Sequence, residues 1–484
     1  LSAGNDNSTT EFSGVLEGAG AFTKVGSGTL TLSGTNTYTG ATTISAGILK
    51  VTADDALGTN AAGTTVASGT TLDFANVTYA TAEVVTVNGG TITTSTGTSS
   101  FAGAITLGAS SIFDVDGTQL TVSGNITDGE NDFNIDKTGS GILVLSNTTN
   151  SYTGTTDISE GTLTITGRLN SGSYSANITN EGAFIYNSTS NQTLGGVISL
   201  TGTLEKANSS TLTLSGTNTY TGTTTITAGT LDVDGTLAQT AVTVASGATY
   251  DVDATDTVLS IAGAGTIDLT NAALTAGDGN DLEFSGVFNG ANDFTKVGSG
   301  TLTLSGDNAT ASYTGRVIID DGVVSVAADS NLGDPDTLDA DRLILKGGTL
   351  SASSNFTLDT NRGITLSTGG GTINVVSGRT LTYGGVIDGS TNLTKDGDGS
   401  LLLSGTSIYS GDTAIDNGEI ILTGALSSST DLTIAATGTL DLRADQTFNT
   451  LTISGAGSGN RIENGDSNTS GDLTVTNAAT LAGN

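Results

Sequence analysis

The nonapeptide GSGTLTLSG fills residues 26–34 and returns letter for letter at residues 298–306, with a near copy, STLTLSGTNTYTG, at residues 210–222. An internal repeat constrains the fold strongly, because each unit must bury its apolar face against equivalent units. Within the repeat, Leu alternates with Thr, as in TLTL at residues 29–32. A period of two predicts a short strand with one buried face.

Five long units share one skeleton: a glycine turn, a lysine, an alternating strand and then Tyr-[Thr/Ser]-Gly. They span residues 12–51, 122–166, 194–233, 284–326 and 383–424. The structural positions that recur are the turn glycine Gly14 with Gly124, Gly196, Gly286 and Gly385; the lysines Lys24, Lys137, Lys206, Lys296 and Lys395; the tyrosines Tyr38, Tyr152, Tyr220, Tyr313 and Tyr409; and the strand leucines Leu30, Leu32, Leu212, Leu214, Leu302 and Leu304. We expect these leucines to point into one core, with the threonines between them outside.

Two all-β architectures compete for such a pattern. Tandem immunoglobulin-like sandwiches would repeat at about 100 residues, whereas the turn glycines here are unevenly spaced. A solenoid tolerates uneven spacing, because gaining or losing one coil leaves its neighbours stacked. The sequence therefore predicts an all-β fold, a parallel β-helix (β-solenoid) forming an elongated rod, continuous over residues 1–484.

Composition excludes several kinds of chemistry. The chain of 484 residues has no Cys and no His, so disulfides, thiol chemistry, His-containing catalytic triads and Cys- or His-ligated metals are excluded. Its net charge of −34 argues against nucleic acid as a partner, because phosphate binding needs clustered Lys and Arg. No catalytic residue and no cofactor-binding residue is expected, and the chain is predicted not to be an enzyme.

Carboxylates leave one enzymatic alternative, a polysaccharide-acting β-helix enzyme, because two acids flanking a glycosidic bond suffice for hydrolysis. The candidate acids are Asp54 with Asp55, Asp320 with Asp321, and the stretch DPDTLDAD at residues 334–341. The competing interpretation is that these acids are solvated residues at the corners of the coils.

The stretch DGNDLEF makes Asp278 and Asp281 candidates for binding Ca²⁺, although the calcium-binding nonapeptide does not recur in series. No other cofactor is expected. Each repeat lysine is expected to pair with a neighbouring acid at the surface. Each repeat tyrosine is expected to pack at a corner with its hydroxyl in water.

The segment GSGTLTLSGTNTYTGATTISAGIL, residues 26–49, resembles the passenger-associated transport repeat, also called the autotransporter-associated β-strand repeat. The resemblance implies a secreted β-solenoid passenger at the cell surface of a Gram-negative bacterium, attached to the membrane only through a barrel outside this chain. It implies a non-enzymatic stalk, adhesin or component of a structural fibre or layer, with an unidentified cell-surface or matrix ligand.

The opening LSAGNDNSTTEFSGV aligns with LTAGDGNDLEFSGV at residues 274–287, inside the chain. Because the first residues match a point inside the repeat pattern, we expect the sequence to be a fragment of a longer solenoid. Uncapped coils expose strand edges, so self-association, end to end or side to side, is also expected.

Overall fold

The computed structural model describes residues 1–237, 239–335, 337–454, 460–465 and 471–481. It consists of β-strands and two short 3₁₀ helices, η1 (Asn170–Gly172) and η2 (Asp329–Leu332). None of the helices in the described part of the chain is long and apolar enough to cross a membrane. The chain forms two compact units, residues 1–241 and 242–484. Continuity of one solenoid over 1–484 stays a prediction.

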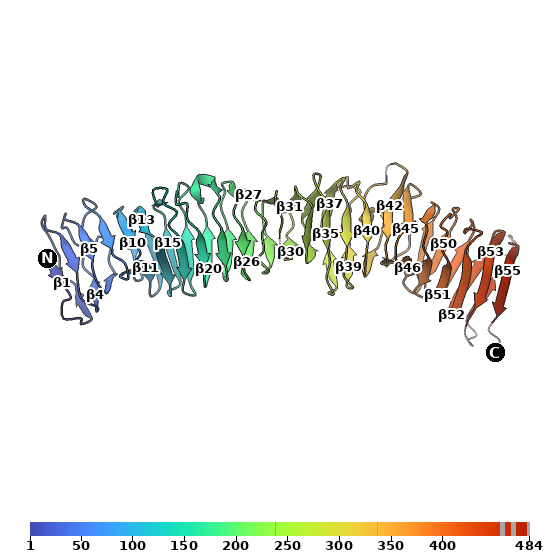
Figure 1. Ribbon diagram of the computed structural model, residues 1–484, viewed down its shortest axis with the longest axis horizontal. Helices are drawn as coiled ribbons and strands as arrows, with labels where there is room; N and C mark the ends of the chain where they lie inside the picture. Colours follow the sequence, from blue (N-terminus) through green and yellow to red (C-terminus); the bar gives the residue numbers. More distant parts are fainter. Residues whose placement is uncertain (238, 336, 455–459, 466–470, 482–484) are drawn as a thin grey trace. The chain divides into compact units, whose positions relative to one another are not determined.

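The first unit is a parallel β-solenoid, in which each strand pairs with the strand one coil further along the chain (Figure 1). One side, which we name sheet A, contains β1 (Ser2–Ala3), β3 (Phe22–Lys24), β5 (Thr42–Ile44), β7 (Thr64–Val66), β10 (Val85–Asn88), β13 (Ile105–Ala109) and β16 (Ile126–Thr127). The partners are about one coil apart in sequence, as Thr23 with Thr43.

A second side, sheet B, contains β2 (Thr10–Phe12), β4 (Thr29–Leu32), β6 (Ile48–Val51), β8 (Thr71–Phe74), β11 (Thr91–Thr94), β14 (Ser111–Val115), β17 (Ile135–Thr138), β19 (Thr156–Ile158), β22 (Ile178–Asn180) and β25 (Ile198–Ser199). The third, sheet C, includes β12 (Thr98–Phe101), β15 (Gln119–Val122), β18 (Ile142–Leu145), β20 (Thr162–Ile165), β23 (Ala183–Tyr186) and β26 (Thr203–Lys206). Successive strands such as β10, β11 and β12 therefore occupy the three sides of one coil.

The second unit repeats this arrangement. One of its sheets contains β32 (Asp256–Val258), β35 (Leu274–Ala276), β38 (Phe294–Lys296), β40 (Val317–Ile319), β42 (Asp339–Leu345), β45 (Arg362–Leu366) and β48 (Ile387–Gly389). Another includes β39 (Thr301–Leu304), β41 (Val323–Val326), β43 (Thr349–Ala352), β46 (Gly371–Val375), β49 (Leu393–Asp396) and β51 (Thr413–Leu422). These pairings are parallel as well, so the predicted all-β parallel solenoid is confirmed in both units.

The core follows the alternation in the sequence. Leu30 and Leu32 are buried on β4, whereas Thr29 and Thr31, which alternate with them, are half-exposed. The same holds for the other strand leucines, which are Leu212 and Leu214 in the first unit and Leu302 and Leu304 in the second. Equivalent residues lie over one another, as Leu30 over Leu49, because the ladders keep their register. The predicted inward leucines are confirmed.

The turn glycines form columns in which one backbone lies directly on the next. A Cβ atom on Gly124 would lie 1.7 Å from the carbonyl oxygen of Gly103, one coil earlier. On Gly286 it would lie 2.0 Å from the oxygen of Gly265. No side chain fits such a gap, so glycine is required by the close approach of neighbouring coils. Gly14 starts the column that continues with Gly34.

We predict that Gly124→Ala lowers the free energy of unfolding by about 3 kcal/mol, because the methyl group must push two coils apart. Gly20→Ala is the control, since nothing lies within 4 Å of the added atom, and it should change stability by less than about 0.5 kcal/mol. Urea unfolding followed by circular dichroism measures both. Equal effects of the two substitutions would contradict the stacking of the glycine column.

Candidate functional site

The five repeat lysines are buried rather than paired with acids at the surface, so that expectation is wrong. Their exposed fractions are 0% for Lys24, Lys137, Lys206 and Lys395 and 2% for Lys296. Among the described residues, the ion pairs of the chain involve other cations, such as Lys346 with Asp320. Each repeat lysine stands two residues after a buried apolar residue, as in Phe22-Thr23-Lys24, so strand alternation turns it inward.

Each buried ammonium group is held by backbone carbonyl groups. Lys137 Nζ donates to the oxygens of Thr138 at 2.7 Å, Gly139 at 2.6 Å and Glu160, on the next coil, at 3.1 Å. Lys24, Lys206 and Lys395 repeat this set of three, with the third carbonyl again one coil away. Lys296 has the two local contacts, at 2.7 Å each. Each three-carbonyl lysine therefore ties its own coil to the next one.

Left-handed residues aim these carbonyls inward. The second residue after each lysine has a positive φ, 72° at Gly139 and 67° at Asn208. The residue after the cross-coil carbonyl is likewise left-handed, as Gly161 with φ 70°. Glycine and asparagine adopt this conformation at low cost. We call the backbone carbonyls around one buried ammonium group a carbonyl cage. The Lys-x-Gly of the repeat is the sequence pattern that marks it.

Burial opposes the charge in these cages. Desolvation lowers the pKa of Lys137, Lys206 and Lys395 to about 8 and also lowers the pKa of Lys24 and Lys296. At neutral pH the three lysines nevertheless remain mostly protonated. An ammonium group that donates three hydrogen bonds satisfies carbonyls that would otherwise be left unpaired in the core.

The repeat tyrosines are also inside, and the expectation of a hydroxyl in water is wrong. Tyr152 is 0% exposed, and its hydroxyl bonds to Thr156 Oγ1 at 2.9 Å. Equivalent bonds to the threonine four residues on occur at Tyr38, Tyr220 and Tyr409. In the fourth unit that position is Val317, and the Tyr313 hydroxyl donates instead to the Arg316 carbonyl oxygen at 2.8 Å. Every corner tyrosine therefore has an internal partner.

An asparagine completes the cluster in four of the units; it stands two residues before the tyrosine in the first three units and five residues before it in the fourth. Asn218 Oδ1 accepts from Ile198 N at 2.9 Å, and its Nδ2 donates to the Thr236 oxygen at 2.9 Å. One amide thus bridges the coil before and the coil after its own. Asn36, Asn150 and Asn308 make the same pair of contacts. We name the lysine, asparagine, tyrosine and threonine of one unit the stacking cluster.

The buried carboxyl of Glu83 lies outside these clusters. Glu83 is 1% exposed and bonds to the Thr64 hydroxyl and, at 3.2 Å, to the Tyr79 hydroxyl. Burial raises the pKa of Glu83 to about 7. No sequence motif marks this residue, because a single acid between two strands looks like a corner residue.

The acids proposed for polysaccharide hydrolysis have structural partners. Asp54 Oδ1 accepts from the backbone nitrogens of Asp55 and Ala80, at 3.1 and 3.0 Å. Asp320 pairs with Lys346 at 2.8 Å, and Asp321 accepts from Gly322 N at 2.7 Å. In the 334–341 stretch, Asp341 pairs with Arg316 at 2.7 Å; Asp336 lies outside the described residues. These acids thus act in turns and in surface ion pairs.

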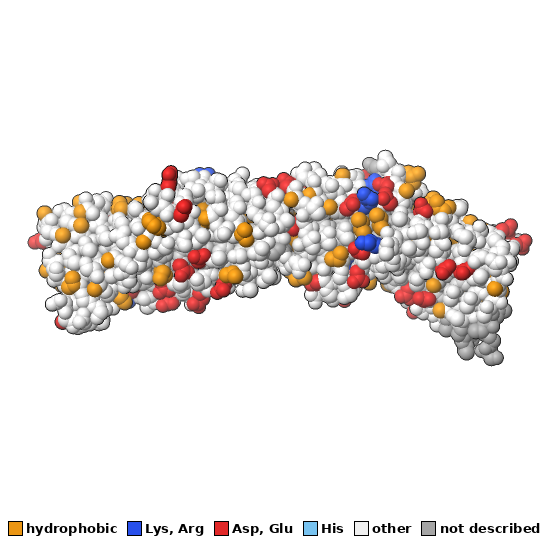
Figure 2. Space-filling model, viewed as in Figure 1, with side chains coloured by type: hydrophobic (Ala, Val, Ile, Leu, Met, Phe, Trp, Pro, Cys, Tyr) orange, Lys and Arg blue, Asp and Glu red, His pale blue; other side chains and the backbone are white. Residues whose placement is uncertain are grey.

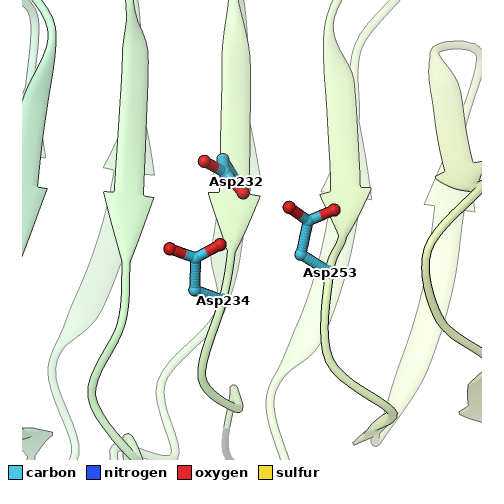
Figure 3. Close-up of side chains that lie close together, drawn as sticks. All are labelled: Asp232, Asp234 and Asp253. Carbon is cyan, nitrogen blue, oxygen red and sulfur yellow. The ribbon is translucent and has the colours of Figure 1, made fainter.

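The candidate calcium ligands are likewise engaged in turns. Asp278 Oδ1 accepts from Asn280 N at 2.8 Å, and Asp281 Oδ1 accepts from Thr301 N, on the next coil, at 2.8 Å. The bond from Thr301 lowers the pKa of Asp281. Calcium binding there stays a prediction. Figure 3 shows further aspartates that the sequence did not single out; Asp232, on β29 (Thr230–Val233), accepts from the Thr213 hydroxyl at 2.9 Å.

Comparison with known proteins gives two matches. The family described as "Passenger-associated-transport-repeat" matches residues 22–51, 135–165, 204–233, 294–326 and 393–422. Each match begins two residues before a caged lysine, and each lies within one predicted unit. The chain is 36% identical over 392 residues to "Adhesin BmaC autotransporter" of Brucella suis biovar 1 (strain 1330), covering 71% of this chain and 11% of that protein. No solved structure gives a significant match.

Removing one cage should destabilise the unit that contains it. We expect Lys395→Met to lower the free energy of unfolding by about 3 kcal/mol, because three buried carbonyls lose their donor. Lys346→Met is the control in the same unit, since this lysine is half-exposed in a surface ion pair, and its loss should cost under about 1 kcal/mol. Denaturant titration measures both. A loss at Lys395 no larger than that at Lys346 would rule out the cage as a stabilising element.

Glu83 should make the stability of the first unit depend on pH. The folded state keeps a proton up to about pH 7 that the unfolded chain releases near its ordinary value of 4.5. The stability of the wild-type chain should therefore fall as pH rises from 4.5 to 7 through this group. Glu83→Gln should remove that decrease and stabilise the protein at pH 8 by up to about 3 kcal/mol, with little effect at pH 4. Thermal unfolding at several pH values tests this; an unchanged pH profile in the variant would contradict it.

Proposed function

Because this chain carries five matches to the passenger-associated transport repeat, we propose that it serves as a non-enzymatic solenoid segment of an autotransporter passenger, a stalk or adhesive surface outside a Gram-negative cell. One observation carries the proposal: the polar groups that the repeats share are the stacking clusters, and these are buried and bonded to backbone or to one another. The polar side chains that recur between units thus hold neighbouring coils together, whereas the exposed side chains are free to differ from coil to coil.

The charge of the surface supports this role. Most charged side chains on the face drawn in Figure 2 are acidic, in keeping with the net charge of −34. Such a surface stays soluble and repels anionic membrane lipid. The similar Brucella protein is named an adhesin, and the present chain spans about 11% of its length. Adhesion by this segment is our proposal for this chain.

Fluorescent beads coated with the purified chain should bind to cultured epithelial cells more than beads coated with an unrelated β-solenoid of similar acidity. Binding should survive Asp54→Asn and Asp320→Asn, because these acids only support turns and a surface ion pair. In parallel, the chain should release no reducing sugar from neutral or acidic polysaccharides. Turnover abolished by one of these substitutions would overturn the non-enzymatic role, and binding equal to that of the control beads would overturn the adhesive one.

A further inference from the structure

From β3 to β16, sheet A presents one threonine per coil in an unbroken row on its outer face. Cα partners along the ladder join, in order, Thr23, Thr43, Thr65, Thr86, Thr106 and Thr127. Each is half-exposed between two buried neighbours, as Thr65 between Thr64 and Val66. Because the strands are parallel and in register, the hydroxyl and methyl groups repeat at the strand spacing of about 4.8 Å.

The residues beside this row are small and uncharged. Two positions before each threonine stand Ala21, Ala41, Gly63, Val84, Ala104 and Asn125, and backbone bonds from Phe22 to Ala41 and from Val85 to Ala104 keep them in line. On the other side lie Val25, Ser45, Ala67 and Asn88. Within residues 21–127, all of which the structure describes, these three rows contain no charged side chain.

Sheet B of the same unit differs in this respect. Its outward residues include Asp136 and Asp157, which are direct partners in the ladder, and Asp114 on β14. Two copies of a chain with a net charge of −34 repel each other, and most strongly where carboxylates would meet. The face of sheet A therefore allows close approach of like-charged copies.

The shape of this face suits packing of sheet on sheet. Threonine is β-branched and loses little rotamer freedom on burial, and identical rows of small side chains interdigitate across a dry interface. The seven strands, about 4.8 Å apart and about five residues wide, give roughly 500 Å² per copy. Two such faces bury about 1,000 Å², the lower limit for a specific interface.

We propose that the outer face of sheet A is a homotypic packing surface on which a second copy of this chain docks, sheet against sheet. A twofold arrangement brings the middle strand, β7, against its equivalent, so Thr65 lies next to the symmetry axis. The contact is weak for two free molecules and becomes strong when many copies are anchored side by side. The occupant is another copy of the chain, so this surface and the proposed adhesion to host cells can fail independently.

Sedimentation velocity over a concentration series tests the proposal. The wild-type chain should show a reversible dimer, and Thr65→Glu with Thr86→Glu should weaken it at least tenfold by placing carboxylates at the centre of the face. The control is Thr121→Glu with Thr164→Glu, which changes outward threonines on sheet C and should leave the dimer intact. Circular dichroism checks that all three proteins fold. A wild-type monomer at every concentration, or equal loss in the control, overturns the proposal.

Cysteine cross-linking gives a second readout, because the chain has no native cysteine. Thr65→Cys should form covalent dimers with a short bismaleimide, since facing sheets lie about 10 Å apart. Thr164→Cys, on sheet C, should not. Cross-linking at Thr164 but not at Thr65 would place the contact on another side of the coil and overturn the proposal.

Discussion

Every coil of this protein depends on the coil beside it for its backbone hydrogen bonds. The strands within a single coil do not pair with one another. The Leu and Val side chains of that coil have no core until another coil covers them. The parallel ladders, such as that joining Thr29–Leu32 to Ile48–Val51, satisfy both needs at once. The other recurring features follow from this requirement, because they let two backbones approach closely: glycine columns, left-handed corners and caged lysines.

Strand alternation predicted much of this from the sequence. The TLTL pattern correctly placed Leu30 and Leu32 inside, and uneven spacing of the turn glycines correctly favoured a solenoid. The same alternation, applied to Phe22-Thr23-Lys24, places the lysine inside too, yet its charge suggested the surface. The carbonyl cage could not be foreseen, because its third acceptor, such as Glu160 for Lys137, comes from the next coil. Tyr152 misled for a different reason: its hydroxyl partner, Thr156, is a polar residue four positions on that is itself buried.

The buried and the exposed side chains have separate roles, which explains how the surface of such a chain can change while its coils stay stacked. Inside, a buried lysine bonded to its two local carbonyls and a buried, hydrogen-bonded tyrosine recur wherever the family repeat occurs. Outside, one side of the first unit carries outward aspartates, of which Asp136 and Asp157 are ladder partners, and another side carries a row of threonines. Surface chemistry can thus change coil by coil without disturbing the stack, which suits the proposed stalk or adhesive role.

The caged lysines offer the most direct test of coil stacking, because each complete cage exists only if two coils are in the observed register. Nitrogen-15 NMR of lysine-labelled protein at neutral pH reports on all seven ammonium groups of the chain. The structure predicts slow exchange with water for Lys24, Lys137, Lys206 and Lys395, and fast exchange for Lys346. Uniformly fast exchange, with no protected ammonium signal, would contradict the stacked arrangement.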